Sequence, residues 1–396
     1  MAPQVSTRPD THVNHAATTV DSTVSIYRRS VCRALLLGGL ATIFPAGATA
    51  PLTVTDMAGR TVTLPAPPQR IVLLEARDIV SMAMLHPDPA SRVVGWAAAD
   101  RIDSALLQSR FADQGRIKVV GKQTPDTISL EALISLSPDL VVTNLYMTPQ
   151  GSDDPLVAQL ARAGIPVIFS DVSSNGVAGT ARGAIANMHS TMRMWGEVLG
   201  AAPQAAALSQ FVDEHLDRVR SRLAGAAPVT TYLELQSTVD DCCWAAGNGV
   251  WGELLALAGG RMLPAVTAPW FQKLQIEYLL ATPHEVYIAS GGGWAVGGRP
   301  AIGPGLDAAS GRAGLARLTE RTGFTGLSSV RQQRVHGIWT GLIAVPPLNM
   351  LFIELAAKWL HPARCLDIDP AATLADINAR FAGVPIPGPL WVSLKE

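Results

Sequence analysis

A short segment of the sequence occurs twice, and this repetition constrains the fold more than any other feature. Residues 130–142 (LEALISLSPDLVV) and residues 276–288 (IEYLLATPHEVYI) match along their whole length at an offset of 146 positions. Each copy predicts a short helix that opens with an acid, a proline turn and a buried strand. The alternative is chance similarity between two ordinary αβ units. We expect two similar lobes, because 396 residues are enough for two domains.

Strand and helix patterns alternate on both sides of a helix-rich stretch. Short apolar runs such as residues 71–74 predict buried parallel strands. Residues 203–223 predict one helix, about 30 Å long at 1.5 Å per residue. We expect an α/β fold of two Rossmann-like lobes with parallel sheets, joined by a single long interdomain helix. The expected parts are an N-terminal lobe at 51–173, a helical linker at 177–224, a C-terminal lobe at 226–345 and C-terminal helices at 346–396.

Residues 1–48 predict an export signal. Arg28 and Arg29 precede an apolar run at 34–44, and small residues follow up to position 50. A cationic segment, a short apolar run and an A-x-A site are typical of a secretory signal peptide, with cleavage expected after Ala48. A membrane anchor is the alternative, but spanning a bilayer needs about 20 apolar residues. We expect a periplasmic protein, and the paired arginines leave both Tat and Sec export open.

The composition and motifs argue against several classes of protein. The net charge of −1 carries no basic excess, so no nucleic-acid partner is expected. The sequence has no G-x-S-x-G, H-E-x-x-H or P-loop motif, so we expect no enzyme, no catalytic residues and no cofactor. A metalloenzyme on a related layered architecture is the alternative, but three cysteines in the mature chain are too few for a cluster cage.

The histidines and cysteines do not predict a metal site. The histidines are scattered, and four convergent ligands are needed to hold a bare metal ion. Cys242 and Cys243 are adjacent, and Cys365 is the third cysteine of the mature chain. Pairing between the neighbours, pairing of one with Cys365, and free thiols all remain open.

Candidate ligand-binding residues come mainly after expected strands, because ligands of open α/β sheets bind beyond the carboxyl ends of the strands. Aromatic faces and an arginine fork suit a large, flat, partly anionic chelate. Core packing is the alternative for each tryptophan, and an ion pair with Glu75 or Asp78 is the alternative for the arginine. The candidates are Arg77, Trp96, Asn144, Tyr146, Trp270, Ser290, Trp294 and Trp339.

Seven segments carry a family pattern, namely residues 54–64, 68–73, 93–95, 137–142, 164–168, 257–260 and 355–362. In order and spacing they resemble the class III substrate-binding proteins of ABC importers, which serve ferric siderophores, haem and vitamin B12. The segment that ends at Asp367-Ile368-Asp369 looks like the iron-complex branch. The resemblance implies a monomer that holds its ligand in a cleft between two lobes. We expect an iron chelate, with haem or a corrinoid as alternatives.

The repeated segment also supplies candidate docking residues. Glu131 and Glu277 occupy the same position in its two copies, at the start of a short helix. The resemblance implies that these acids dock the protein on the permease dimer of the importer. The alternative is that each carboxylate is favoured there by the helix dipole alone.

Overall fold

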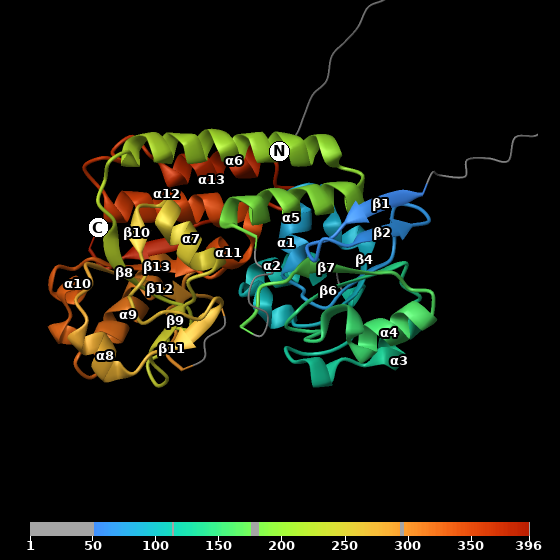
Figure 1. Ribbon diagram of the computed structural model, residues 1–396, viewed down its shortest axis with the longest axis horizontal. Coiled ribbons are helices and arrows are strands. Elements are labelled where there is room, and N and C mark those ends of the chain that lie inside the picture. The colour runs from blue at the N-terminus through green and yellow to red at the C-terminus, as the bar shows by residue number, and fades with distance from the viewer. Residues whose placement is uncertain (1–50, 113–114, 176–181, 294–296, 396) are drawn as a thin grey trace, which may run out of the picture. The chain divides into compact units, whose positions relative to one another are not determined.

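The computed structural model describes residues 51–112, 115–175, 182–293 and 297–395. Two large β-sheets, each with its own helices, a two-stranded hairpin and a layer of long helices make up this part of the chain (Figure 1). The expected export signal and its cleavage position at Ala48 lie outside the described residues. No helix in the described ranges is long and apolar enough to cross a membrane.

The N-terminal lobe is built on a five-stranded sheet whose order is β5-β4-β3-β6-β7. All of its strand pairs are parallel, which confirms the predicted parallel sheet. Parallel strands are covered on both faces, and this is why they consist of apolar runs. A hairpin precedes the sheet. The strands are β1 (Leu52–Thr55), β2 (Thr61–Leu64), β3 (Ile71–Leu73), β4 (Val93–Trp96), β5 (Lys118–Val119), β6 (Leu140–Asn144) and β7 (Val167–Asp171), and the helices are α1 (Asp78–Ala83), α2 (Ala105–Ala112), α3 (Leu130–Ser135) and α4 (Pro155–Arg162).

The C-terminal lobe has a mixed sheet of order β11-β9-β8-β12-β13-β14, and β10 pairs with β8. Its centre, β8-β12-β13, is parallel, whereas β9, β11 and β14 pair antiparallel to their neighbours. A short connection joins β8 to β9, whereas α7 and β10 lie between β9 and β11, and α11, α12 (Asn349–Leu360) and α13 (Pro370–Arg380) lie between β13 and β14. The strands are β8 (Val229–Glu234), β9 (Trp244–Ala246), β10 (Gly260–Arg261), β11 (Phe271–Lys273), β12 (Val286–Gly291), β13 (Val335–Trp339) and β14 (Trp391–Ser393), and the helices are α7 (Val250–Leu257), α8 (Ile276–Ala281), α9 (Ala308–Thr319), α10 (Ser328–Arg331) and α11 (Gly341–Ala344).

The two copies of the repeated segment fold alike. The first forms α3 and β6, the second forms α8 and β12, and each element begins 146 positions after its counterpart. Leu133 and Leu279 are fully buried at equivalent positions of the two helices. Both strands lie inside their sheets, since β6 pairs with β3 and β7 while β12 pairs with β8 and β13. The repetition therefore marks the same structural unit in both lobes.

The helical linker contains two helices, α5 (Ala184–Leu199) and α6 (Ala202–Leu223). They approach closely at Gly196, where a Cβ atom would lie 2.6 Å from Cβ of Ala205. The predicted long helix is α6, which begins beside α5 and continues over the C-terminal lobe (Figure 1). There it packs on α12 (Asn349–Leu360), and His215 of α6 lies 2.7 Å from Glu354 of α12.

The last segment of the chain differs from the expectation of helices alone. Residues 346–396 do contain α12 and α13 (Pro370–Arg380), but β14 (Trp391–Ser393) then adds an edge strand to the C-terminal sheet. A strand of only three residues is too short to show an apolar periodicity in the sequence. The strand forms because β13 offers an open row of backbone hydrogen-bonding groups at that edge.

Candidate functional site

A cleft of about 490 Å³ lies between the two lobes and is lined by residues of both. On the N-terminal side its walls are the segments that follow β3, β6 and β7, together with part of α5. Because parallel strands end at the same edge of a sheet, these segments gather at one place. On the C-terminal side the walls come from α7, the loop before β11 and the segment around α11.

Backbone and side-chain contacts join the lobes on either side of this cleft. Asp103 of the N-terminal lobe forms an ion pair with Arg299 at 2.8 Å, and its carbonyl accepts a hydrogen bond from the Trp339 indole at 3.0 Å. Asn175 binds the C-terminal lobe through its side chain, which donates to the carbonyl of Phe271 at 2.9 Å and accepts from the amide of Trp270 at 3.0 Å. These contacts hold the cleft walls at a set separation.

The N-terminal half of the cleft is rich in carboxylates. Glu75 follows β3, Asp78 opens α1, and Asp171 is the last residue of β7. Glu75 is only 7% exposed, and its Oε2 accepts from Arg101 at 2.8 Å and from Asn144 at 3.4 Å. The other oxygen, Oε1, has no hydrogen-bond partner among the described residues, and neither has Oδ2 of Asp78.

Burial changes the acidity of two of these groups. It raises the pKa of Asp78 well above its usual value; a hydrogen bond from Ser170 opposes the rise, and the charges of Glu75 and Asp171 add to it. Burial also raises the pKa of Asp171, although hydrogen bonds from Ser173 counteract part of the effect. Burial thus makes both carboxylates costly to ionise, and the charge of Arg77 offsets only part of this cost at Asp78.

Three arginines line the cleft, and each is held by the protein itself. Arg77 donates from Nε to the carbonyl of Arg101 at 2.7 Å and lies 4.0 Å from Glu75. Arg101 uses one amino group for Glu75 and the other for the carbonyl of Gln123 at 2.8 Å. Arg299 pairs with Asp103. The alternative noted for Arg77, a pair with Glu75, is therefore present at the limit of ion-pair distance.

The C-terminal half of the cleft is mainly aromatic. Trp270 lies 5.8 Å from Tyr146 of the opposite lobe, 6.2 Å from Trp251 and 5.0 Å from Phe271, measured between ring centroids. The guanidinium of Arg101 lies 4.2 Å from the centre of the Tyr146 ring, within the range of a cation–π contact. The rings form an aromatic cluster that crosses from one lobe to the other.

The Trp270 loop is fixed by its own backbone. The amide of Gly247 donates to the carbonyl of Trp270 at 2.7 Å, and the amide of Gly249 donates to that of Pro269 at 2.9 Å. A Cβ atom at Gly247 would come within 2.5 Å of both loop residues, so only glycine permits this approach. The Trp251 indole is anchored by donating to the carbonyl of Ile343 at 2.9 Å. These aromatic side chains are thus positioned before any ligand arrives.

The structure divides the residues that the sequence proposed for ligand binding into three groups. Arg77, Asn144, Tyr146 and Trp270 line the cleft. Trp294 lies outside the described residues. The remaining three are buried in the protein and do not line the cleft, namely Trp96, Ser290 and Trp339.

These three residues are buried for identifiable reasons. Trp96 ends β4 and packs into the hydrophobic core of the N-terminal lobe. The Ser290 hydroxyl donates to the carbonyl of Leu235 on the neighbouring segment. Trp339 is fully buried with its indole bonded to Asp103. For Trp96 and Trp339 the placement matches the alternative of core packing, since a strand end points a side chain either toward the cleft or into the sheet interface.

Among the cleft residues that sequence reasoning did not select are Asp171 and Trp251. Asp171 follows the apolar run of β7 and obeys the same strand-end rule that found Asn144. Trp251 lies in the first turn of α7 and carries no strand signal at all. Only the packing of α7 beside the Trp270 loop brings it to the cleft.

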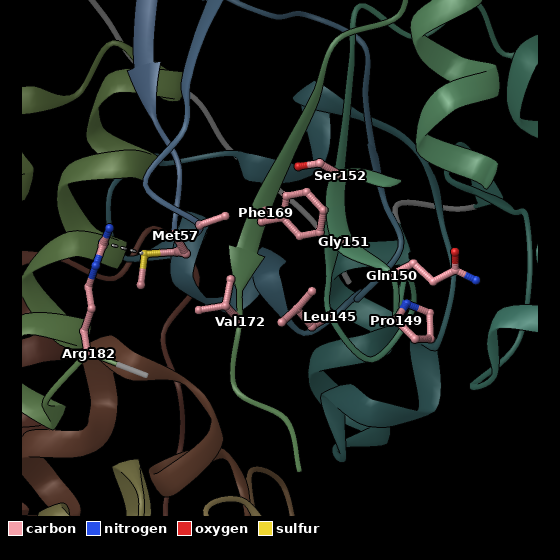
Figure 2. A pocket seen from close by; sticks show the side chains of 10 residues that line it. Met57, Leu145, Pro149, Gln150, Gly151, Ser152, Phe169, Val172 and Arg182 are labelled. Carbon is pink, nitrogen blue, oxygen red and sulfur yellow. Dashed lines mark hydrogen bonds between the residues drawn. The ribbon is translucent and has the colours of Figure 1, made fainter. Parts of the chain in front are cut away.

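A second, smaller pocket of about 380 Å³ adjoins the cleft and shares Val172 with it. Figure 2 shows its apolar wall, in which Phe169 and Leu145 face the Met57 side chain. Arg182 lies at one side and donates to the sulfur of Met57 at 3.9 Å. Residues of the C-terminal lobe do not line it, so we assign ligand binding to the larger cleft.

The cysteines are paired in one of the ways that the sequence left open. Cys242 and Cys243 form a disulfide, and Cys365 is a buried free thiol. Among the described residues, these two cysteines and Glu234 are the one group of metal-type ligands that converges. The two sulfurs are bonded to each other, and Glu234 is paired with Arg321 at 3.0 Å. The group is thus engaged in structural contacts.

The two candidate docking acids occupy equivalent exposed positions. Glu131 lies in the first turn of α3 and Glu277 in the first turn of α8, and both are exposed. The two helices lie along the edge of the lobes opposite α6 (Figure 1). One turn after each acid comes an exposed apolar side chain, Ile134 at 41% and Leu280 at 39% exposure.

Comparison with known proteins places this architecture. Residues 83–338 match the model of a family described as periplasmic binding protein, which is more than half of the chain. A search of curated proteins gave no match.

Solved structures of similar fold include a TroA-like periplasmic binding protein, FepB, from Veillonella parvula, with 23% identity, a TM-score of 0.72, and coverage of 87% of this chain and 100% of that one. The molybdate-bound protein MolA of Haemophilus influenzae has 17% identity, a TM-score of 0.66, and coverage of 84% and 98%. A protein of an ABC-type Fe³⁺-hydroxamate transport system from Saccharomonospora viridis has 19% identity, a TM-score of 0.57, and coverage of 79% and 100%.

Proposed function

The chain belongs to the periplasmic binding protein family, and from this premise we propose that it captures an iron chelate and delivers it to the permease dimer of an ABC importer. Members of this family bind a small molecule in the periplasm for such an importer. The observation that supports an iron chelate as the ligand is the cleft itself. It has a volume of about 490 Å³ and an aromatic cluster contributed by both lobes. A volume of roughly 300–1,000 Å³ suits an organic ligand of several hundred daltons.

A bare oxyanion such as molybdate, which one structurally similar protein binds, fits this cleft poorly. Five carboxylates and three arginines line it, and each arginine already has a partner within the protein. Because the carboxylates outnumber the arginines, a bare anion would meet more acidic than basic groups in the cleft. A chelate places organic surface against the rings of Tyr146, Trp251 and Trp270, where burial of apolar area favours binding.

Tryptophan fluorescence tests the proposal directly, because Trp251 and Trp270 line the cleft. Purified mature protein is titrated with ferric hydroxamates, ferric catecholates, haem, a corrinoid, molybdate and a nickel–histidine complex. We expect saturable quenching by a ferric chelate with one site per chain, checked by calorimetry. Binding of haem or the corrinoid alone would support those alternatives, and binding of molybdate or nickel–histidine alone would contradict the proposal.

We also propose that the exposed acids Glu131 and Glu277 contact the permease, and the structure supports a wider docking surface. Ile134 and Leu280 are exposed apolar residues one helical turn beyond the acids, at the same offset of 146 positions. Residues three apart on a helix lie on one face. Each lobe thus presents a carboxylate beside an apolar contact, and a permease dimer has two equivalent surfaces to receive them.

Charge reversal tests this docking surface. In cells whose own copy is replaced, the Glu131→Lys, Glu277→Lys double variant should lower chelate uptake at least about tenfold, because like charges facing each other across an interface cost several kcal/mol. Chelate affinity should not change. The Ile134→Ser, Leu280→Ser double variant should reduce uptake less.

The matched control is Asp217→Lys with Asp376→Lys, two exposed acids on α6 and α13. Its uptake should equal that of the wild type. Normal uptake by the Glu131, Glu277 double variant, or uptake lost together with chelate affinity, would refute the docking assignment.

A further inference from the structure

Two carboxylate oxygens in the cleft lack the donors that buried oxygens normally have. Glu75 is 7% exposed, yet its Oε1 has no hydrogen-bond partner among the described residues. Oδ2 of Asp78 is buried and is also without a partner there. Most buried polar groups in proteins are hydrogen-bonded, and an unpaired one costs about 1–3 kcal/mol. Both residues line the cleft, so a donor on the ligand can supply the missing hydrogen bonds.

The protein's own cations do not fill this need. Arg101 reaches Glu75 only at Oε2, and its second amino group is bound to the carbonyl of Gln123. Arg77 directs its Nε toward the carbonyl of Arg101, 4.0 Å away from Oε1 of Glu75. Arg299 pairs with Asp103 on the other side of the cleft. The N-terminal half of the cleft therefore keeps an excess of acceptors.

The surroundings of the acids add further hydrogen-bond acceptors. Ser173 donates its proton to Asp171 at 2.9 Å, which leaves its oxygen lone pairs free to accept. Asn187 and Thr191 of α5 line the same cleft with an amide and a hydroxyl. An ammonium group has three donors and no acceptor, and it needs this type of environment. A carboxylate or catecholate group has the opposite requirement.

We infer that the cleft selects ferric chelates that carry an alkylammonium arm, and that Glu75, Asp78 and Asp171 hold this arm while the aromatic cluster holds the body of the chelate. The inference rests on the proposed function and specifies the ligand's charge. It revises the sequence-based expectation of a partly anionic chelate, because the arginine on which that expectation depended, Arg77, is engaged with backbone and Glu75.

The acidity of the site supports this assignment. Burial raises the pKa of Asp78 and of Asp171, so each gains a favourable interaction when a cation arrives and its carboxylate form becomes stable. The charged groups around Asp78 are Glu75, Asp171 and Arg77. Affinity for an ammonium-bearing chelate should therefore rise with pH through the raised pKa values, while affinity for an uncharged chelate should stay constant.

Three matched ligands test the inference. A linear ferric trihydroxamate is prepared with a terminal ammonium, with that amine acetylated, and with it succinylated so that the arm becomes anionic. By fluorescence quenching we expect the ammonium form to bind about tenfold or more tightly than the acetylated form, since hydrogen bonds to charged groups are the stronger class. The succinylated form should bind most weakly.

Equal affinities, or an order led by the succinylated form, would overturn the inference and leave the proposed function standing. Failure of all three, together with ferric catecholates, would instead count against an iron chelate as the ligand. The two failures are thus distinguishable.

Variants of the cleft acids test where the ammonium arm of the chelate binds. Asp78→Asn and Asp171→Asn should each reduce the preference for the ammonium form over the acetylated form to about twofold or less. Asp376→Asn, an exposed acid on α13, is the control and should keep the full preference. Circular dichroism verifies folding, and Glu75→Gln serves if either aspartate variant does not fold. A preference that survives in all three cleft variants would refute the assignment.

Discussion

The two lobes use the ends of their parallel strands for different purposes. In the N-terminal lobe, the residues after β3, β6 and β7 open into the cleft, and Asp78 and Asn144 are among them. In the C-terminal lobe, residues after β8 and β13 also reach the cleft, among them Gln236 and Thr340, but the acid at the end of β8 makes internal contacts. Glu234 at the end of β8 is fully buried, paired with Arg321, and accepts hydrogen bonds from the hydroxyls of Tyr232 and Tyr287.

This difference shows that a position at the end of a strand does not by itself make a residue part of the binding site. The carboxylates of both lobes lie beside strands, but Glu234 has a complete set of donors, whereas Glu75 and Asp78 each keep one oxygen without a partner. In a residue that lines the cleft, an oxygen without a partner leaves a place where a donor on the ligand can bind. The C-terminal lobe supplies the aromatic part of the cleft surface from a loop and a helix, through Trp270 and Trp251.

The largest expected effect is the loss of stability when the buried carboxylate of Glu234 loses its ion-pair partner. Arg321→Met leaves the buried Glu234 carboxylate without its cation, and removing one partner of a buried pair costs about 3–5 kcal/mol. We expect the free energy of unfolding to fall by that amount in urea denaturation. Arg222→Met breaks an exposed pair with Asp367 and is the control, with a much smaller expected loss because solvent screens the pair. Equal losses in the two variants would mean that Glu234 is no more structural than a surface acid.

An intermediate effect is expected on chelate affinity, and it distinguishes Trp270, which lines the cleft, from the buried Trp339. Trp270→Ala removes the ring between Tyr146 and Trp251, so chelate affinity should fall about tenfold, or ~1.4 kcal/mol. Its stability should change little, because the loop is held by backbone hydrogen bonds to Gly247 and Gly249. Trp339→Ala is the counterpart and should cost about 3–5 kcal/mol of stability. A stable Trp339 variant with lost binding would reverse the assignment of the two residues.

The smallest effect is the pH dependence of Asp78. Its pKa is raised in the folded state, so folding favours the protonated form and stability falls as pH rises from the usual aspartate pKa through the raised value. Asp78→Asn removes this penalty. In the absence of ligand, the variant should gain stability relative to the wild type as pH increases from 4 to 8. A constant difference across thermal melts at these pH values would show that the carboxylate is not destabilised by burial.

The sequence predicted one half of the cleft better than the other. Asn144 and Tyr146 follow an apolar run, and the strand-end rule located both correctly at the cleft. The same rule failed for Ser290, because that side chain closes a hydrogen bond to a neighbouring segment. It also could not find Trp251, which reaches the cleft from a helix. No local pattern tells whether a strand-end side chain will meet solvent or another part of the chain.

By itself the sequence determined the alternation of the main parallel strands with helices, the repeated unit of the two lobes and the long helix α6. These follow from apolar periodicity and turn residues, which act between near neighbours in the chain. Only the tertiary structure decided which acids are satisfied. Glu234 meets Arg321, 87 positions away, whereas Glu75 shares Arg101 with a backbone carbonyl and keeps one oxygen unpaired. Hydrogen-bond satisfaction depends on groups that come together only when distant segments pack, so the chemistry of the cleft is a property of the fold.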